Sequence, residues 1–377
     1  MSPSAGAPYL VVAASGRQLA QSAARGGHDV VVVDWFADRD TCAAARAVRR
    51  AVSPDELRFD PDTLLQAAEE LAPAASCAGL VAGSGLEDAP PLLQHLTLGR
   101  RLYGNEAQVV AATKDPARFF PLLDRLGIPH PEISLRRPPD TCGWLAKRAG
   151  GAGGAHVVPA AACGADEDRI YFQRREDGRS LSLLFLANGR RAWIVGCSEQ
   201  LHADSSLGQP FLFAGVIGGV SLPPAAEDAL QAALDALVDE YALVGLNGID
   251  FLLRDDRCSV LELNPRPTAA LDCYDADFAC GLFDWHLRAC GGELPGFAYA
   301  PGAARGHAVV YAGARGTVHS DTRFPAWCSD LPQPGTRYAA ADPLCTVHAS
   351  ASTPDAVRRL LAQRAAAMQH LLTAEAA

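Results

Sequence analysis

Apolar residues form short continuous runs in the first hundred residues of the chain. The run "YLVVAAS" (9–15) precedes a helical stretch over 18–25, and a second run, "GGHDVVVVD", ends at Asp34. A third run, "CAGLVAGSG", covers 77–85. Strands that are apolar on both faces are typical of parallel sheets covered by helices. The pattern predicts a Rossmann-like α/β domain over 1–105, although no GxGxxG dinucleotide motif follows the first strand.

The middle of the chain has a different pattern, in which strands alternate with turns. "GWLAKRAGGAGGAHVVPA" (143–160) predicts a strand, a glycine-rich loop and a second strand. Further strands are separated by turns at 174–178 and 188–189. An amphipathic helix is predicted over 227–241. This mixture predicts an α+β fold.

The last part of the chain is predicted to be poor in regular structure. From about residue 300, prolines and glycines recur, so we expect loops until a closing helix over 354–372.

Composition and charge narrow the class of protein. The chain has 377 residues, of which 49% are apolar and 20% are charged, as in an ordinary globular protein of two or three domains. A net charge of −10 argues against nucleic-acid binding, which needs a basic face. The chain shows neither a basic leader nor an apolar run near the roughly 20 residues of a membrane span. Eleven cysteines without a CxxC pair favour a reduced, cytoplasmic protein.

Lysine is rare in this chain. Of the 33 basic residues, only Lys114 and Lys147 are lysines. Because an ammonium group is a compact point charge and a guanidinium group is a planar fork, the two remaining lysines are candidates for a specific charge contact. The alternative is that both are ordinary surface residues.

Three polar side chains interrupt the apolar hairpin sequence "GIDFLLRDDRCSVLELNPRP". If a three-residue loop joins the two strands, Asp250 lies opposite Glu262, and period-two alternation puts Asn264 on the same face as Glu262. A two-residue turn would instead bring Asp250 opposite Leu261. Two carboxylates and an amide oxygen suit Mg²⁺ that also bridges substrate phosphates. The alternative interpretation is a polar strand end at the rim of a sheet.

A second group of residues suits phosphate binding. Lys147 ends an apolar strand and is followed by the run Gly150-Gly151-Ala152-Gly153-Gly154, whose backbone amides can surround phosphate oxygens. Arg266 follows the hairpin at a place where it can contact a γ-phosphate or an acyl phosphate. The sequence contains no GxxxxGK[ST] motif, so a P-loop is excluded. The alternative for the glycine run is a flexible turn.

These motifs resemble the ATP-grasp superfamily of ligases over nearly the whole chain. "TKDPARFFPLLDRLGIPHPE" is similar to the Lys-Asp segment that precedes its nucleotide fold, and "WLAKRAGGAGGAHV" to its strand lysine and phosphate-covering loop. "LVGLNGIDFLLRDDRCSVLELNPRP" is similar to its metal-binding Asp…Glu-x-Asn-Pro-Arg signature, the most specific of the three. The resemblance implies ATP and Mg²⁺ as cofactors, with Mn²⁺ as an alternative ion.

The resemblance also implies roles for individual residues. The implied metal ligands are Asp250, Glu262 and Asn264. The implied nucleotide-binding residues are Lys114, Lys147, Gly151, Gly153, Gly154, Gln173, Arg174, Arg175 and Glu176. Of these, residues 173–175 form the hinge whose backbone meets adenine, and the ribose ligand is left open between Glu176 and Ser180. Lys147 and Arg266 carry the catalytic roles. The implied division is a Rossmann-like domain over 1–105, small and large ATP-grasp subdomains over 106–180 and 181–298, and a C-terminal segment over 299–377 that packs on the large subdomain.

The two ends of the chain add a narrower resemblance. The closing sequence "DLPQPGTRYAAADPLCTVHASASTPDAVRRLLAQR" resembles distant relatives of biotin carboxylase, and the opening sequence "AASGRQLAQSAARGGHDVVVVDWFADRDT" resembles tyramine–glutamate ligases of methanofuran-type cofactor synthesis. They imply a carboxylate–amine ligase that forms an amide through an acyl phosphate, with glutamate and a small amine as substrates in one-carbon cofactor synthesis. Small-molecule carboxylate and amine partners are expected, and a homodimer is left open.

Two other functions stay open. A biotin-carboxylase-like or carbamoyl-type enzyme would use the same acyl-phosphate chemistry, but the chain has no Met-Lys-Met carrier segment. A non-catalytic ATP-binding protein would have no evident need for the complete Asp, Glu and Asn set.

Overall fold

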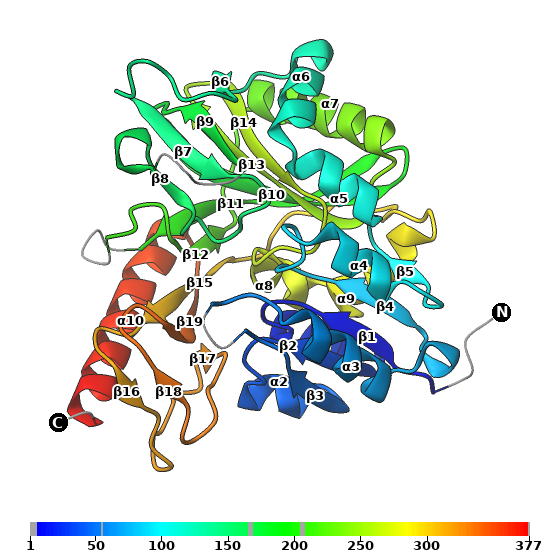
Figure 1. Cartoon of the computed structure of the whole chain (residues 1–377), viewed down its shortest axis with the longest axis vertical. Helices are drawn as coiled ribbons and strands as arrows, with labels where there is room; N and C mark the ends of the chain where they lie inside the picture. Colours follow the sequence, from blue (N-terminus) through cyan, green and yellow to red (C-terminus); the bar gives the residue numbers. More distant parts are fainter. Residues whose placement is uncertain (1–5, 54–55, 165–168, 204–207, 376–377) are drawn as a thin grey trace.

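The structure is a computed structural model of the chain. It describes residues 6–53, 56–164, 169–203 and 208–375 (Figure 1). Within these ranges, no helix combines the length and the apolarity that a helix needs to cross a membrane.

The N-terminal part is a parallel sheet with helices, as the apolar runs predict. Its strands follow the order β3-β2-β1-β4-β5, and β1 pairs in parallel with both β2 and β4. The strands are β1 (Tyr9–Val12), β2 (Val30–Asp34), β3 (Ala47–Arg50), β4 (Gly79–Ala82) and β5 (Leu102–Tyr103). The helices are α1 (Arg17–Arg25), α2 (Arg39–Ala44), α3 (Pro61–Leu71) and α4 (Pro90–Leu96).

Two antiparallel sheets follow, and they form the mixed part of the fold. The helices α5 (Ala107–Lys114) and α6 (Pro116–Leu126) lead to the small sheet, ordered β6-β9-β7-β8. Its strands are β6 (Ile133–Ser134), β7 (Trp144–Arg148), β8 (Val157–Pro159) and β9 (Ile170–Arg174). The large sheet begins with β10 (Arg179–Asn188), β11 (Ala192–His202), β12 (Phe213–Gly218), β13 (Val244–Arg254) and β14 (Arg257–Asn264). In Figure 1 the small sheet lies at the upper left beside β13 and β14 of the large sheet, and the N-terminal sheet lies at the lower right.

The C-terminal part contains more strand than the sequence predicts. The strands β15 (Ala304–Tyr311) and β19 (Pro343–Ala351) extend the large sheet, whose order is β14-β13-β10-β11-β12-β15-β19-β17. The expectation of a loop-rich segment was therefore wrong for these two stretches. β15 pairs with β12 and β19 pairs with β15, and this pairing completes the backbone hydrogen bonds of short apolar stretches flanked by proline and glycine. The remaining elements are β16 (Gly316–Thr317), β17 (Cys328–Ser329), β18 (Arg337–Tyr338) and α10 (Pro354–Glu375).

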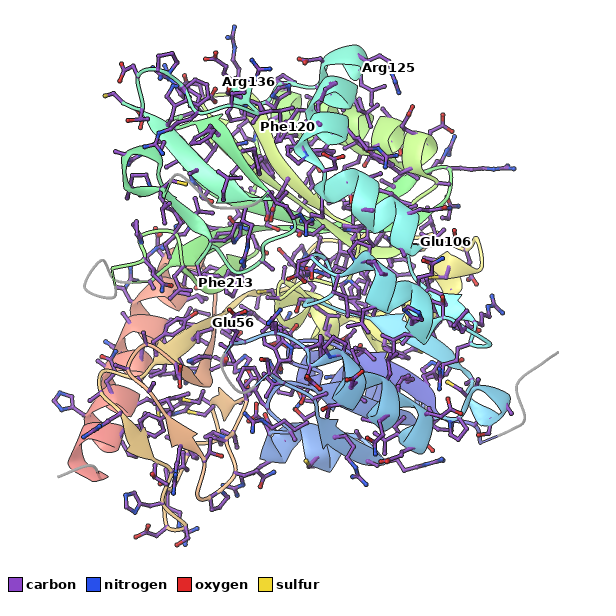
Figure 2. All side chains as sticks on the ribbon, in the orientation of Figure 1. Glu56, Glu106, Phe120, Arg125, Arg136 and Phe213 are labelled. Atoms are coloured by element: carbon purple, nitrogen blue, oxygen red, sulfur yellow. The ribbon has the colours of Figure 1, made fainter. Side chains whose placement is uncertain are left out.

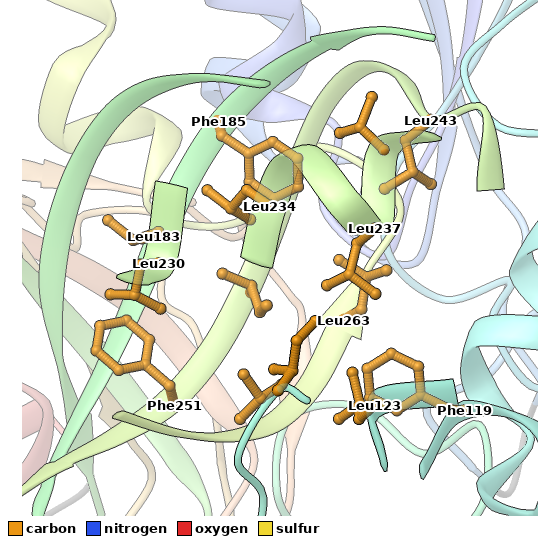
Figure 3. Close-up of a cluster of buried hydrophobic side chains, with 14 of the residues drawn as sticks. Phe119, Leu123, Leu183, Phe185, Leu230, Leu234, Leu237, Leu243, Phe251 and Leu263 are labelled. Carbon is orange, nitrogen blue, oxygen red and sulfur yellow. The ribbon is translucent and has the colours of Figure 1, made fainter. Parts of the chain in front are cut away.

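The large sheet is buried on both faces, which explains the apolar sequence of β10. Leu183 and Phe185 pack on one face against Leu230 and Leu234 of α7 (Pro224–Tyr241), in the core shown in Figure 3. The intervening residue Leu184 points to the other face, because side chains alternate along a strand. That face is covered by α8 (Leu271–Tyr274) and α9 (Gly281–Cys290). Burying each such leucine or phenylalanine stabilises the fold by roughly 1.5–3 kcal/mol.

One buried asparagine joins the N-terminal part to the end of β14. Asn105 Nδ2 donates to Asn247 Oδ1 at 2.8 Å and to the Pro265 carbonyl at 3.0 Å. Asn105 Oδ1 accepts from the Val244 N–H at 3.0 Å. These bonds fix the position of the chain at the end of β14, and therefore the position of the Arg266 backbone.

A buried arginine joins the N-terminal part to the C-terminal part. Arg17 is 2% exposed, and its guanidinium donates to Asp272 Oδ2 at 2.6 Å and to Asp330 Oδ1 at 2.8 Å. Burial alone would raise the pKa of both carboxyls, but the charge of Arg17 holds each pKa below its ordinary value. The network therefore contributes stability at neutral pH that is lost as the pH falls through the acid range.

We expect Arg17→Met to lower the free energy of unfolding by about 3–5 kcal/mol, because it leaves Asp272 and Asp330 buried without their counter-ion. Denaturant unfolding at pH 7 measures the effect. The control is Arg46→Met, which removes the exposed pair with Asp29 and should cost less than about 1 kcal/mol. Equal losses in the two variants would contradict a structural role for the buried network.

Candidate active site

The hairpin of β13 and β14 brings Asp250 opposite Glu262, as predicted, but by another route. The strands are joined by a two-residue turn, Asp255-Asp256, and the predicted three-residue loop is wrong. Asp255 has φ +55°, the left-handed conformation that tight hairpin turns require. A two-residue turn alone would bring Asp250 opposite Leu261. A β-bulge in β14 absorbs that extra residue and restores the pairing with Glu262.

The polar side chains of this hairpin contact one another and Lys114. Asn264 Nδ2 donates to Asp250 Oδ2 and to Glu262 Oε1, both at 3.2 Å. Lys114 Nζ donates to Asn264 Oδ1 at 2.7 Å and to Glu262 Oε2 at 3.5 Å. Lys114 is the last residue of α5 and is 8% exposed, so its charge is held against β14. The structure therefore brings four of the predicted site residues into one cluster.

The two carboxyl groups of this cluster have opposite pKa shifts. Burial, followed by repulsion from Glu262, raises the pKa of Asp250 to about 7. Burial acts in the same direction on Glu262, but Lys114 and the hydrogen bond from Asp250 hold the pKa of Glu262 well below its ordinary value. Two close carboxylates avoid ionising together unless a cation is present. The pair is thus arranged so that added positive charge favours its fully ionised form.

The donor set suits Mg²⁺ better than a metal held by protein alone. No group of three or more His, Cys, Asp or Glu side chains in the described part of the chain is placed to hold a metal ion. Asp250 and Glu262 supply hard carboxylate oxygens, and the Asn264 amide lies between them. Mg²⁺ is commonly held by one or two carboxylates together with substrate phosphates. The three residues fit an ion that arrives with a nucleotide.

Lys147 and the glycine run lie across the cavity from this cluster. Lys147 is in β7, opposite Tyr171 of β9 and Val157 of β8. Burial lowers the pKa of Lys147, and the charges of Glu262 and Asp250 oppose that shift. Lys147 therefore lines the same cavity as Asp250 and Glu262, close enough to interact with the charges of both carboxylates.

The glycine run makes close contacts that a side chain would block. The Phe213 N–H donates to the Gly153 carbonyl at 2.9 Å, which holds the run against the start of β12. Gly154 has φ +75°, and a Cβ there would lie 1.8 Å from the Phe211 carbonyl oxygen. A Cβ at Gly151 would lie 2.3 Å from the His156 ring. The run therefore needs glycine at Gly151 and Gly154 for packing, which supports a compact cover and not a freely flexible turn.

The predicted hinge lies at the end of β9. Gln173 is 1% exposed, and its Nε2 has no hydrogen-bond partner among the described residues. The N–H groups of Arg174 and Arg175 already donate to the carbonyls of Glu132 and Gly143, both at 2.8 Å. The backbone amides of Arg174 and Arg175 are therefore already paired within the protein. Ser180 donates to Gln200 Oε1 at 2.8 Å.

Most of the predicted residues line one cavity of about 580 Å³, a size typical of small-molecule sites. The predicted residues that line it are Lys147, Gly153, Gly154, Gln173, Arg174, Arg175, Glu176, Ser180, Asp250, Glu262, Asn264 and Arg266. Lys114 and Gly151 line a small neighbouring hollow that shares Glu262 with it. Figure 2 labels Phe213, another lining residue, between the upper and lower parts of the molecule.

The sequence did not predict the partner of Arg266. Arg266 Nε donates to Glu87 Oε1, and Glu87 Oε2 accepts from the Gly85 N–H at 2.6 Å. Glu87 is 3% exposed; burial would raise its pKa, but the charges of Arg266 and Lys114 bring the pKa below its ordinary value. The only sequence feature that could have indicated this partner is the acidic residue in the glycine-containing loop after β4. Nothing in the sequence indicates that this loop lies beside Arg266.

The chain matches one protein-family model. Residues 114–270 match the family described as ATP-grasp domain. No curated protein matches the sequence of the chain.

Solved structures of similar fold extend the likeness over nearly the whole chain. The N5-carboxyaminoimidazole synthase of Aspergillus clavatus, solved with ADP and 5-aminoimidazole ribonucleotide, has a TM-score of 0.70 and 15% identity, covering 95% of this chain and 99% of that chain. The biotin carboxylase domain of Hydrogenobacter thermophilus 2-oxoglutarate carboxylase has a TM-score of 0.70 and 12% identity, covering 91% and 86%. N5-carboxyaminoimidazole synthetase of Staphylococcus aureus has a TM-score of 0.67 and 14% identity, covering 95% and 97%.

The matched domain, together with the fold, assigns the class of protein. The chain contains an ATP-grasp domain over residues 114–270, as its motifs predict. The mixed α/β architecture, a parallel N-terminal sheet followed by antiparallel sheets, is confirmed as well.

We expect Gly154→Ala to raise the KM for ATP about tenfold or more, because the added Cβ clashes with the Phe211 carbonyl and displaces the run. Steady-state ADP release measures this. Gly153→Ala is the matched control: Gly153 has φ +71°, but a Cβ there meets no atom within 4 Å. The same rise in both variants would mean that backbone strain, and not the close contact, is responsible.

A second variant tests the contact between Glu87 and Arg266. We expect Glu87→Gln to lower kcat about 10- to 100-fold with a smaller change in the KM for ATP, because a neutral amide holds the guanidinium less firmly. The control is Glu106→Gln, an exposed acid next to α5 (Figure 2). An unchanged kcat in Glu87→Gln would show that Arg266 does not depend on this contact.

Proposed function

We propose that the chain is an ATP-dependent carboxylate–amine ligase that forms an amide through an acyl phosphate and releases ADP and phosphate. The observation that carries this proposal is the cluster of Asp250, Glu262, Asn264 and Lys114 beside the cavity that Lys147 also lines. Its cofactors are ATP and Mg²⁺, with Mn²⁺ as the alternative ion. The ADP and MgADP complexes of the structural neighbours support this choice.

The residues of the chain act by position and charge. Asp250, Glu262 and Asn264 hold the metal ion, and Lys114, Lys147 and Arg266 hold phosphate oxygens. Mg²⁺, when bound, neutralises charge on the transferred phosphoryl group. The substrate carboxylate attacks the γ-phosphorus and ADP leaves. The amine then attacks the acyl carbon, phosphate leaves, and the amine proton passes to the released phosphate. No side chain acts as a covalent nucleophile, because positioning and electrostatics supply the rate enhancement in this chemistry.

The narrower part of the proposal is that glutamate is attached to a small amine in the synthesis of a one-carbon cofactor. It is supported by the resemblance of the opening and closing segments to tyramine–glutamate ligases and their relatives. A cytoplasmic setting is supported by the cysteines, none of which forms a disulfide in the described structure. A homodimer stays a prediction.

A second candidate function is favoured by the structural neighbours. Biotin carboxylase domains and carboxyaminoimidazole synthetases share the fold, so bicarbonate is a candidate for the activated carboxylate. The chain lacks a Met-Lys-Met carrier segment of its own. A screen of amino acids and bicarbonate against amines, with release of ADP and phosphate as the readout, separates the two. Bicarbonate dependence would favour the carboxylase, and no turnover with any pair would favour a non-catalytic ATP-binding protein.

We expect Glu262→Ala and Lys147→Ala each to lower ADP release by about 100-fold or more, because both side chains act on the same triphosphate. The measurement is steady-state ADP release with the active substrate pair, and circular dichroism checks that each variant is folded. Asp256→Ala, in the exposed turn of the same hairpin, serves as the control and should keep full activity. Normal ADP release from either site variant would refute its assignment.

A further inference from the structure

The cavity continues beyond the phosphate-binding residues to the carboxyl edge of the N-terminal sheet. Ala14 follows β1, Trp35 follows β2 and Ser84 follows β4, and all three line this end of the cavity. Ala269 and Ala270, which follow Arg266 along the chain, also line it. In the proposed reaction, this end is the space available for the acceptor amine, because the hinge and the metal cluster occupy the rest.

The basic side chains of the cavity belong to its phosphate end and to the hinge. Among the described residues, those that line it are Lys147, Arg174, Arg175 and Arg266. Lys147 is assigned to the triphosphate, and Arg266 is already paired with Glu87. Arg174 and Arg175 lie at the hinge, and the Arg174 guanidinium packs over the ring of Trp144 and donates to the Cys142 carbonyl. The stretches outside the described residues contain no lysine or arginine in their sequence.

Acidic side chains of the protein already contact the start of the helix at this edge. α1 begins at Arg17, and a helix N-terminus ordinarily attracts negative groups. Here the Gly16 N–H already donates to Asp34 Oδ2 at 3.1 Å, and Ser15 Oγ donates to Asp330 Oδ1 at 3.1 Å. The Arg17 guanidinium is buried between Asp272 and Asp330. The Arg17 guanidinium, which is the one cation at the start of this helix in the described part of the chain, is therefore already neutralised by the protein.

We infer that the acceptor amine carries no phosphate and no carboxylate, and that its body is uncharged and at least partly apolar. A second anionic group would be buried against Ala14, Trp35 and Ala269 without a counter-ion, which costs several kcal/mol. An apolar body would instead bury surface against the same residues and gain free energy. This inference rests on the proposed ligase function and narrows its acceptor to simple amines, excluding amino acids and nucleotides.

Matched amine pairs test the inference with the full chain. 3-Methylbutylamine and L-leucine differ by one carboxylate, and ethanolamine and O-phosphoethanolamine differ by one phosphate. Each is supplied with MgATP and the carboxylate found active in the screen, and amide formation is measured by mass spectrometry. We expect kcat/KM to be at least about tenfold higher for the member without the anionic group. An equal or higher kcat/KM with leucine or O-phosphoethanolamine would overturn this inference but not the proposed ligase function.

A failure of the proposed ligase function can be distinguished from a failure of the inference about the acceptor amine. No amide from any amine, with MgATP binding intact by calorimetry, would overturn the ligase proposal and this inference with it.

A charge-adding variant provides a second test. Ser84→Arg places a cation at the edge of the sheet and should shift the rate ratio toward leucine by at least about tenfold. Ser76→Arg, an exposed position of the same N-terminal part, is the control and should leave the ratio unchanged. An unchanged ratio in a folded Ser84→Arg protein would overturn the role assigned to the missing charge.

Discussion

The site depends on one cross-strand pair, Asp250 and Glu262. Their pairing exists because a β-bulge offsets the two-residue turn of the hairpin, and every other polar contact of the cluster is built on it. Asn264 bridges the two carboxylates, and Lys114 reaches the cluster from the end of α5. A shift of one residue would turn one of the carboxylates to the apolar face of the sheet, where it would have no counter-ion.

The cluster is held in place by contacts between distant parts of the chain. Asn105 fixes the end of β14, and Glu87 holds Arg266 from the N-terminal part. Arg17 joins the N-terminal part to the C-terminal part through two buried carboxylates. The same carboxylates remove positive charge from the edge of the N-terminal sheet. Stability and substrate selection therefore share one electrostatic arrangement, in which cations are available at the phosphate end of the cavity and not at the acceptor end.

Local patterns predicted much of the fold. The apolar runs indicated the parallel strands, and period 3.6 indicated α7, because both signals depend on residues close in sequence. β15 and β19 were missed because each pairs with a strand that is distant in sequence, β15 with β12 and β19 with β15, and because proline and glycine surround them. The hairpin was predicted with the right pairing from a wrong turn. A two-residue turn with a bulge and a three-residue loop without one give the same cross-strand pairing. The sequence pattern does not distinguish these two arrangements.

The sequence by itself determined the chemistry of the site: two scarce lysines, a glycine run, and an Asp, Glu and Asn set next to an arginine. Only the tertiary structure decided which charges meet. Glu87 faces Arg266, Lys114 faces Asn264, and Asp34 and Asp330 cover the start of α1. The physical reason is that residue types and short-range periodicity depend only on residues close together in the sequence. Charge compensation, in contrast, is a sum over groups brought together from distant segments, and it is defined only once the chain has folded.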